Sequence, residues 1–206
     1  MIVELSTIVL AATMWGVMFG LEWGNFWLSM TFAATLLAVT GIVATRSELQ
    51  RIYAFRPIHI AIGVVSAIVL YVVFWIGDFV SAIVFPFAAD QVGGIYAMKT
   101  QMNPVTIGLL LFFIIGPAEE IFWRGFIQER FAKRWGDTVG WIVAGCVYAA
   151  VHIWSWNFML VMAALVCGVF WGWMYMRWKS LWPGIISHAV WDVLVFLIIP
   201  IRPIPS

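Results

Sequence analysis

Long apolar stretches are the feature that most constrains the fold, because seven of them are each about long enough to cross a lipid bilayer. A transmembrane helix needs about 20 predominantly apolar residues. We therefore predict an all-α fold, a polytopic transmembrane helix bundle of about seven spans. The predicted spans are residues 3–22, 26–45, 58–77, 105–128, 138–154, 157–176 and 181–200.

The composition agrees with a membrane protein. Of the 206 residues, 64% are hydrophobic and only 10% are charged, whereas soluble domains carry about 25% charged residues. The formal net charge of +1 excludes a basic surface for nucleic acid. Cys146 and Cys167 both lie in apolar runs, so we interpret them as packing residues rather than a disulfide or a metal knuckle.

Between the spans, the chain offers few other elements. Pro86, Gly93, Gly94 and Pro104 interrupt residues 78–104, which we predict to be a loop with a re-entrant or interfacial piece. Residues 47–56 are a candidate short amphipathic segment on the membrane surface. No internal repeat divides the chain, so we expect a single integral membrane domain over residues 1–206.

Positively charged residues predict the orientation, since Lys and Arg are enriched in cytoplasmic loops. Lys99 and Arg202 fall on one side of the predicted bundle. Eight others fall on the opposite side: Arg46, Arg51, Arg56, Arg130, Lys133, Arg134, Arg177 and Lys179. We predict a cytoplasmic N-terminus in the cell (inner) membrane. No Lys or Arg precedes Arg46, so we expect no cleavable signal peptide.

A few ionisable residues lie inside the predicted spans. Each such residue costs on the order of 3 kcal/mol on insertion scales and is a functional hypothesis by default. His59, at the start of a span, is better explained as an interfacial residue. The others predict an intramembrane polar cavity: Glu119, Glu120, Arg124, His152, His188 and Asp192.

Helical spacing divides these residues by role. Glu120 and Arg124 are four residues apart and so share a helix face, which predicts an ion pair. Glu119 lies about 100° around the helix, so it has no local partner and is the sharper candidate for a general base. His188 and Asp192 repeat the four-residue spacing, and His152 has no partner within a turn.

The predicted depths of these residues disagree. If the fourth span ends near Glu129, Glu119 lies about 15 Å from that end. His152 lies about 22 Å along its span, and His188 about 11 Å along its own. Helix tilt of about 20° and side-chain reach would have to bring these groups together.

Two hydrolytic mechanisms fit such a set of residues. In one, a glutamate and a histidine activate a water, while the other polar pair stabilises the oxyanion. In the other, histidines and a carboxylate hold a zinc ion that activates the water. The zinc signature with two histidines four apart on one helix is absent, as is a G-x-S-x-G serine motif.

Three short motifs resemble those of the CPBP family, which comprises CaaX proteases and bacteriocin-processing enzymes and is also called the Abi family. Residues 119–125, EEIFWRG, resemble its EExxxR motif. Residues 148–152, YAAVH, resemble FxxxH, and residues 188–192, HAVWD, resemble HxxxN/D. The motifs occur in the family's order, and the resemblance covers a motif-bearing core of about residues 105–200.

This resemblance implies an intramembrane glutamic-type endopeptidase that needs no cofactor. It would hydrolyse a peptide bond near the C-terminus of a membrane-associated protein or peptide. By the family's pattern, Glu119 and His152 would activate the water, and His188 and Asp192 would bind the oxyanion. The supporting pair would then be Glu120 and Arg124.

The sequence departs from the family pattern at two positions. Tyr148 replaces the Phe of the second motif and adds a hydroxyl that needs a partner. Asp192 stands where many members have Asn, and an ionised carboxylate cannot donate to an oxyanion. Either Asp192 is protonated in this apolar setting, or it orients and charges His188, which then donates alone. Our hypothesis is the second of these.

Alternatives remain at this point. The same residues would also suit a non-catalytic membrane immunity or scaffold protein in which they merely hold the bundle together. A transporter is less well supported, because no paired pattern of broken spans is visible. Gly168 and Gly172 suit packing within one bundle as well as dimerisation, so the sequence predicts no oligomeric state.

Overall fold

A computed structural model describes residues 1–202, and within this range the chain is helical without any strand. Labels with α denote α-helices, and labels with η denote short 3₁₀- or π-helical segments. The elements in chain order are α1 (Ile2–Trp15), η1 (Gly16–Gly20), α2 (Phe26–Ala44), η2 (Arg46–Glu48), α3 (Leu49–Ile52), α4 (Ile58–Val84), α5 (Ala88–Ala97), η3 (Met98–Gln101), α6 (Pro104–Leu110), η4 (Leu111–Ile115), α7 (Gly116–Glu120), η5 (Ile121–Gln128), α8 (Glu129–Trp135), α9 (Asp137–Ala150), η6 (Val151–Ser155), α10 (Phe158–Trp178), α11 (Trp182–Val193) and η7 (Leu194–Ile198).

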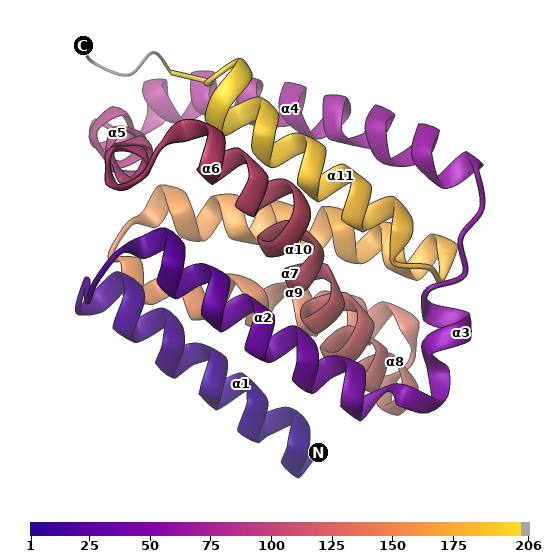
Figure 1. Cartoon of the computed structure of the whole chain (residues 1–206). Coiled ribbons are helices and arrows are strands. Elements are labelled where there is room, and N and C mark those ends of the chain that lie inside the picture. The colour runs from indigo at the N-terminus through magenta and orange to yellow at the C-terminus, as the bar shows by residue number, and fades with distance from the viewer. Residues whose placement is uncertain (203–206) are drawn as a thin grey trace.

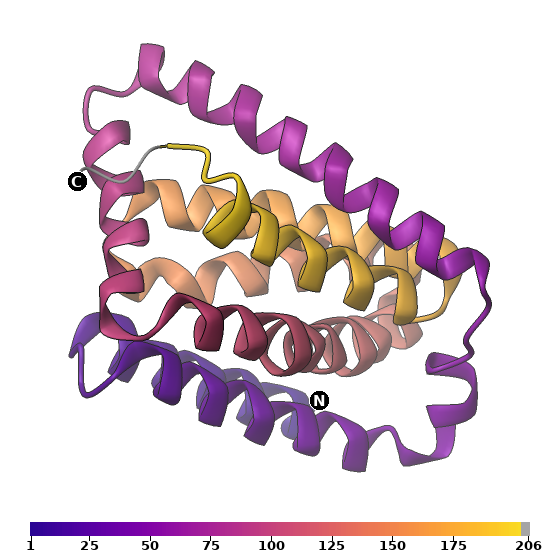
Figure 2. The same cartoon turned by 45° about the horizontal axis from the view of Figure 1, so that its top comes forward.

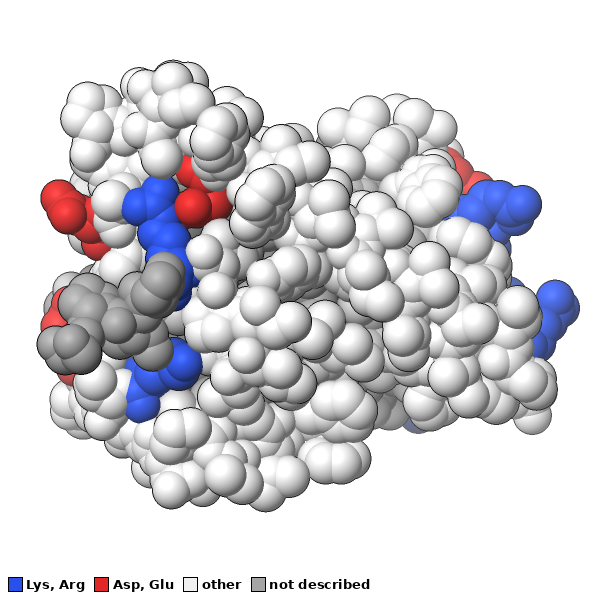
Figure 3. All heavy atoms as spheres, turned by 90° about the horizontal axis from the view of Figure 1, so that it is seen from above, with Lys and Arg blue, Asp and Glu red and all other residues white. Residues whose placement is uncertain are grey.

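The predicted polytopic helix bundle is confirmed. In the described part of the chain, six helices are long and apolar enough to cross a membrane, and a seventh apolar helix, Trp182–Ile198, is shorter. They lie side by side, with α1 and α2 on one flank and α4 on the other (Figures 1 and 2). Charged side chains gather at the two ends of the molecule and leave a broad uncharged band between them (Figure 3). The protein is therefore a multi-pass membrane protein.

The loop predicted over residues 78–104 is wrong. Instead α4 continues to Val84, and α5 and η3 fill most of the remainder. Prolines do mark the breaks: Pro86 separates α4 from α5, and Pro104 opens α6 at a position where its missing N–H costs nothing. Gly93 and Gly94 do not break α5, because a glycine inside a helix costs only about 1 kcal/mol.

The fourth membrane helix is longer than predicted. It runs from Pro104 to Trp135 rather than over 105–128, and its charged final turns continue the same helix. Glu129 is buried in this extension, where the Tyr175 hydroxyl donates to its Oε2 at 2.7 Å and Arg51 lies 2.6 Å from its Oε1. Buried partners of this kind allow a charged turn to remain helical beyond the apolar span.

Residues 47–56 pack against the bundle instead of lying free on its surface. The side chain of Ile52 is fully buried, and its carbonyl accepts from the N–H of Leu181 at 2.9 Å. Glu48 pairs with Arg51 and Lys133. Although burial opposes the ionisation of Glu48, hydrogen bonds from Lys133 and Arg51 hold the pKa of this carboxyl below its usual value. This segment thus ties one end of the bundle together.

Glycines set the closest helix contacts. A Cβ on Gly168 of α10 would lie 3.0 Å from the carbonyl oxygen of Gly145 on α9. A Cβ on Gly172 would meet Trp141 and Gln128 at 2.8 and 2.9 Å. Both small residues therefore serve packing within the bundle.

Candidate active site

A cavity of about 480 Å³ opens inside the bundle, between helices from both halves of the chain. Four of the six predicted site residues line it: Glu119, His152, His188 and Asp192. Glu120 and Arg124 are buried behind its wall. The structure thus places Glu120 and Arg124 apart from the other four residues, as helical spacing did.

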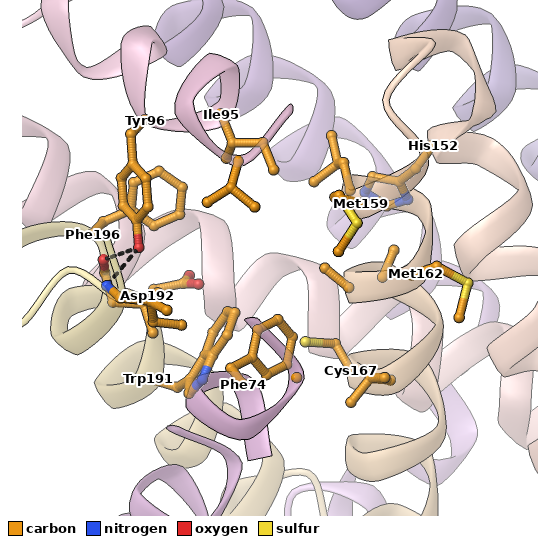
Figure 4. Close-up of a pocket in the computed structure, with 18 of the residues that line it drawn as sticks. Phe74, Ile95, Tyr96, His152, Met159, Met162, Cys167, Trp191, Asp192 and Phe196 are labelled. Atoms are coloured by element: carbon orange, nitrogen blue, oxygen red, sulfur yellow. Dashed lines mark hydrogen bonds between the residues drawn. The ribbon is translucent and has the colours of Figure 1, made fainter. Parts of the chain in front are cut away.

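The walls of the cavity are mostly apolar. In Figure 4, His152 and Asp192 lie on opposite sides of the space. Met159 and Met162 come from the α10 side, Ile95 from α5 and Phe74 from α4 (Figure 4). An apolar chamber with a few convergent polar groups is the usual form of a site for a small or extended ligand.

Glu119 points toward α9. Its Oε2 accepts a hydrogen bond from the Tyr148 hydroxyl at 2.7 Å, and the carboxylate is 5% exposed. The hydroxyl that Tyr148 adds to the motif therefore has a partner. Glu119 also has a partner, but one that lies 29 residues away on another helix.

Glu120 points the other way and forms the predicted ion pair. Its Oε1 lies 3.0 Å from Nη1 of Arg124 and also 3.0 Å from Nδ1 of His188. Its Oε2 has no hydrogen-bond partner among the described residues. One carboxylate oxygen therefore joins the first motif to the third.

Arg124 is fully enclosed. Its Nη2 donates to the carbonyl oxygens of Cys167 and Gly168 at 3.3 and 3.5 Å. The guanidinium also lies 4.8 Å from the ring centre of Tyr148, an arrangement that favours a cation over an aromatic face. Its partners on α9 and α10 thus stabilise the positive charge of the guanidinium, which Glu120 offsets only in part.

His188 lies between two carboxylates. Nδ1 faces Glu120, and Nε2 lies 3.5 Å from Oδ2 of Asp192, an ion-pair distance without a hydrogen bond. The ring stacks on Trp171 with centroids 3.7 Å apart and planes 17° from parallel. Glu120, which we had not expected as a partner of His188, is therefore the closer of its two carboxylates.

His152 lies in η6, at the end of the fifth membrane helix. Its Nδ1 lies 2.8 Å from the carbonyl oxygen of Tyr148, and its Nε2 accepts from the indole N–H of Trp15 at 3.2 Å. The 3₁₀ turn is closed by Ser155, whose hydroxyl donates to the carbonyl of His152 at 2.7 Å. Both ring nitrogens of the imidazole are thus held.

Backbone irregularity accompanies the first motif. Two π-helical segments, η4 and η5, flank the short helix α7, which ends at Glu120. Such π segments occur frequently at functional sites, because they rotate the side chains that follow. Here the two adjacent glutamates face two different helices, α9 and α11.

The depth mismatch is resolved by the longer fourth helix. Counted from Trp135 instead of Glu129, Glu119 lies about 24 Å from the helix end, close to the value of about 22 Å for His152 measured from Asp137. The third motif is joined to this level directly, by the contact of His188 with Glu120.

No group of three or more His, Cys, Asp or Glu side chains in residues 1–202 is arranged to hold a metal ion. Zinc requires three or four such ligands around one point. The cavity residues are therefore not gathered around one point as zinc ligands would be.

Sequence reasoning missed two aromatic contributors, Trp15 and Trp171. Both are fully buried beside a site histidine. The chain has 14 tryptophans, and no spacing among them singles out either one. A tryptophan deep in an apolar span, whose N–H needs a buried acceptor, is the signal that was available.

Comparison with known families agrees with this site. Residues 101–194 match the family described as type II CAAX prenyl endopeptidase Rce1-like. This segment is similar to the Rce1-like family. The predicted relation to the CPBP family is confirmed, and all six site residues lie within the Rce1-like segment. No curated protein and no solved structure matched the chain.

Proposed function

We propose that the protein is an intramembrane endopeptidase of the CaaX-protease type. The observation that carries the proposal is that Glu119, His152, His188 and Asp192, which come from three separate motifs, all line one cavity. The alternative scaffold role requires no such chamber, because polar groups that only hold helices together pair with one another and leave no space for a ligand. The similarity of residues 101–194 to the Rce1-like family supports the same activity.

In the proposed reaction, a water in the cavity attacks the scissile carbonyl carbon. Glu119 takes a proton from this water, and the nitrogen Nε2 of His152 accepts the hydrogen bond of its other proton. The tetrahedral intermediate then collapses as the C–N bond breaks. The protonated Glu119 returns its proton to the leaving amine, so the products are a carboxylic acid, which keeps the other proton of the water, and a free amine.

His188 is the proposed oxyanion donor. Its Nδ1 donates to Glu120, which leaves Nε2 directed toward Asp192 and the cavity. Two flanking carboxylates match the charge of an imidazolium, and this form carries a proton on Nε2 that it donates to the oxyanion. Asp192 then orients His188 and does not itself donate.

The proposed substrate is a membrane-associated protein or peptide, cut near its C-terminus. The mostly apolar wall formed by residues such as Phe74, Ile95 and Met159 suits an apolar chain segment entering from the bilayer. Among the described residues, no Lys or Arg lines this wall to attract an acidic soluble peptide.

The test is cleavage of a panel of membrane-anchored tail peptides by the purified protein in detergent. Glu119→Gln removes the base and is expected to lower the rate at least 100-fold, the lower range for general base catalysis, with a melting temperature lowered by no more than about 4 °C. Glu22→Gln, which changes an exposed glutamate in a loop, is the matched control and should leave the rate unchanged.

The scaffold alternative predicts a different result. If Glu119→Gln melts at a much lower temperature, or the wild-type protein cuts no peptide of a broad panel, the polar cluster is structural and the proposed activity is wrong. Exhaustive chelation tests the zinc alternative, and the rate is expected to survive it.

A further inference from the structure

Two hydrogen bonds determine which ring nitrogen of His152 carries the proton. Nδ1 lies 2.8 Å from the carbonyl oxygen of Tyr148, which only accepts, so Nδ1 donates. Nε2 lies 3.2 Å from Nε1 of Trp15, and an indole N–H only donates. The imidazole is therefore neutral, with its proton on Nδ1 and the lone pair of Nε2 facing the indole.

Packing fixes the indole at this place. Trp15 is fully buried at the end of α1. Its ring meets Trp123 edge-on at 6.5 Å and the imidazole edge-on at 5.9 Å between centroids. Trp15 lies well outside the Rce1-like segment, so the first helix adds a contact that this segment does not supply.

Burial of the His152 ring opposes a second proton, and a neighbouring carboxylate favours one. Glu119 from α7 is the charged group that faces the ring, and Tyr148 from α9 is its other titratable neighbour. The remaining aromatic neighbours, Trp15 and Phe19, carry no charge. A nearby carboxylate stabilises imidazolium, and an imidazolium paired with Glu119 would stop that carboxylate from accepting a proton from water.

We propose that Trp15 is a positioning residue that keeps His152 neutral and thereby keeps Glu119 available as the base. The proposal rests on the proposed peptidase function. The indole occupies Nε2 in the resting site, and the reacting water takes its place there during turnover. The indole N–H, which only donates, opposes a proton on Nε2. Water can donate or accept, so it hydrogen-bonds to Nε2 whether or not that atom carries a proton.

Trp15→Phe tests the idea, since it keeps an aromatic ring and removes the donor, together with part of the ring volume. The full-length protein with ¹⁵N-labelled histidine is titrated by NMR in detergent, and His152→Gln assigns the signals. We expect wild-type His152 to show the tautomer with the proton on Nδ1. In Trp15→Phe, the ring should take up its second proton at a pH about half to one unit higher, the shift that corresponds to one net hydrogen bond.

Cleavage rates give the second readout. The acid side of the pH–rate profile of Trp15→Phe should move to higher pH by the same half to one unit, with the alkaline plateau unchanged. Trp141→Phe is the matched control. It lies on α9 like the motif residue Tyr148, loses a similar indole hydrogen bond at 2.8 Å to the carbonyl of Val169, and does not line the cavity.

Two results would overturn the proposal. One is a wild-type spectrum in which Nε2 carries the proton of the neutral ring. The other is a rate that falls by the same factor at every pH in Trp15→Phe, as a loss of packing alone would cause. If the wild-type protein cuts no peptide, the proposed function fails, while the spectra still decide whether Trp15 keeps His152 neutral.

Discussion

At the scale of single residues, the two adjacent glutamates differ in their partners. Glu119 lines the cavity and receives one hydrogen bond from a neutral hydroxyl. Glu120 is fully buried, and one of its oxygens contacts both Arg124 and His188. Loss of charge at these neighbouring positions should therefore have opposite consequences for stability and for activity.

Glu120→Gln is expected to destabilise the protein by about 3 kcal/mol or more, because it leaves the buried charge of Arg124 without its counter-ion. Glu119→Gln should cost about 1 kcal/mol or less, since its hydrogen bond to Tyr148 has a neutral donor. Melting temperatures of both variants in one detergent measure the contrast. Equal losses would contradict the division of roles between the two glutamates.

The sequence was informative about which residues form the site and less so about what holds them. Each charged residue inside an apolar span can be identified from the sequence by itself. The spacing of four residues predicted the ion pair of Glu120 and Arg124. The contact between Trp15 and His152 joins positions 137 residues apart. No local sequence pattern predicts such a contact, because the contact depends on how separate helices pack.

At the scale of helices, the spans were predicted closely and their ends were not. A long apolar run indicates which part of a helix lies within the bilayer. The end of that helix depends on capping residues and on side-chain contacts beyond the apolar run. The burial of Glu129 against Tyr175 let the fourth helix extend to Trp135. From composition alone, those charged turns were predicted to lie in a loop.

Gly140→Ala should destabilise the bundle by about 1–3 kcal/mol, the usual cost of overpacking. A Cβ at this position in α9 would clash with the backbone nitrogen of Ala132 in α8, and backbone cannot rotate away. Gly77→Ala in α4 is the matched control, because nothing lies within 4 Å of its Cβ. Thermal melting of the two variants measures the difference, and similar curves would rule out a tight contact between α8 and α9.

At the scale of the whole molecule, the helices divide the protein into two charged ends and an apolar middle (Figure 3). The end near Met1 also holds α3 and α8, while α5 lies at the other end (Figure 1). Lys and Arg are concentrated at the first of these ends, as the sequence predicted for a cytoplasmic face.

Cysteine labelling tests this orientation. Ser47 and Thr100 are exposed near opposite ends of the bundle. In intact cells, a membrane-impermeant maleimide should label Thr100→Cys and should reach Ser47→Cys only after permeabilisation. The parent protein, whose Cys146 and Cys167 both lie in spans, is the control. The reverse pattern would place the N-terminus outside the cytoplasm.

The late place of α11 in the chain order has a consequence for biosynthesis. Arg124 leaves the ribosome beside its own counter-charge Glu120, so the fourth span enters the bilayer with that pair already made. Glu120 meets His188, and His152 gains a completed cavity around it, only when α11 has been translated. A nascent or truncated chain that lacks α11 has neither His188 nor Asp192. Under the proposed function, the chain is therefore inactive while it is being made, and it does not cut its own unfinished spans.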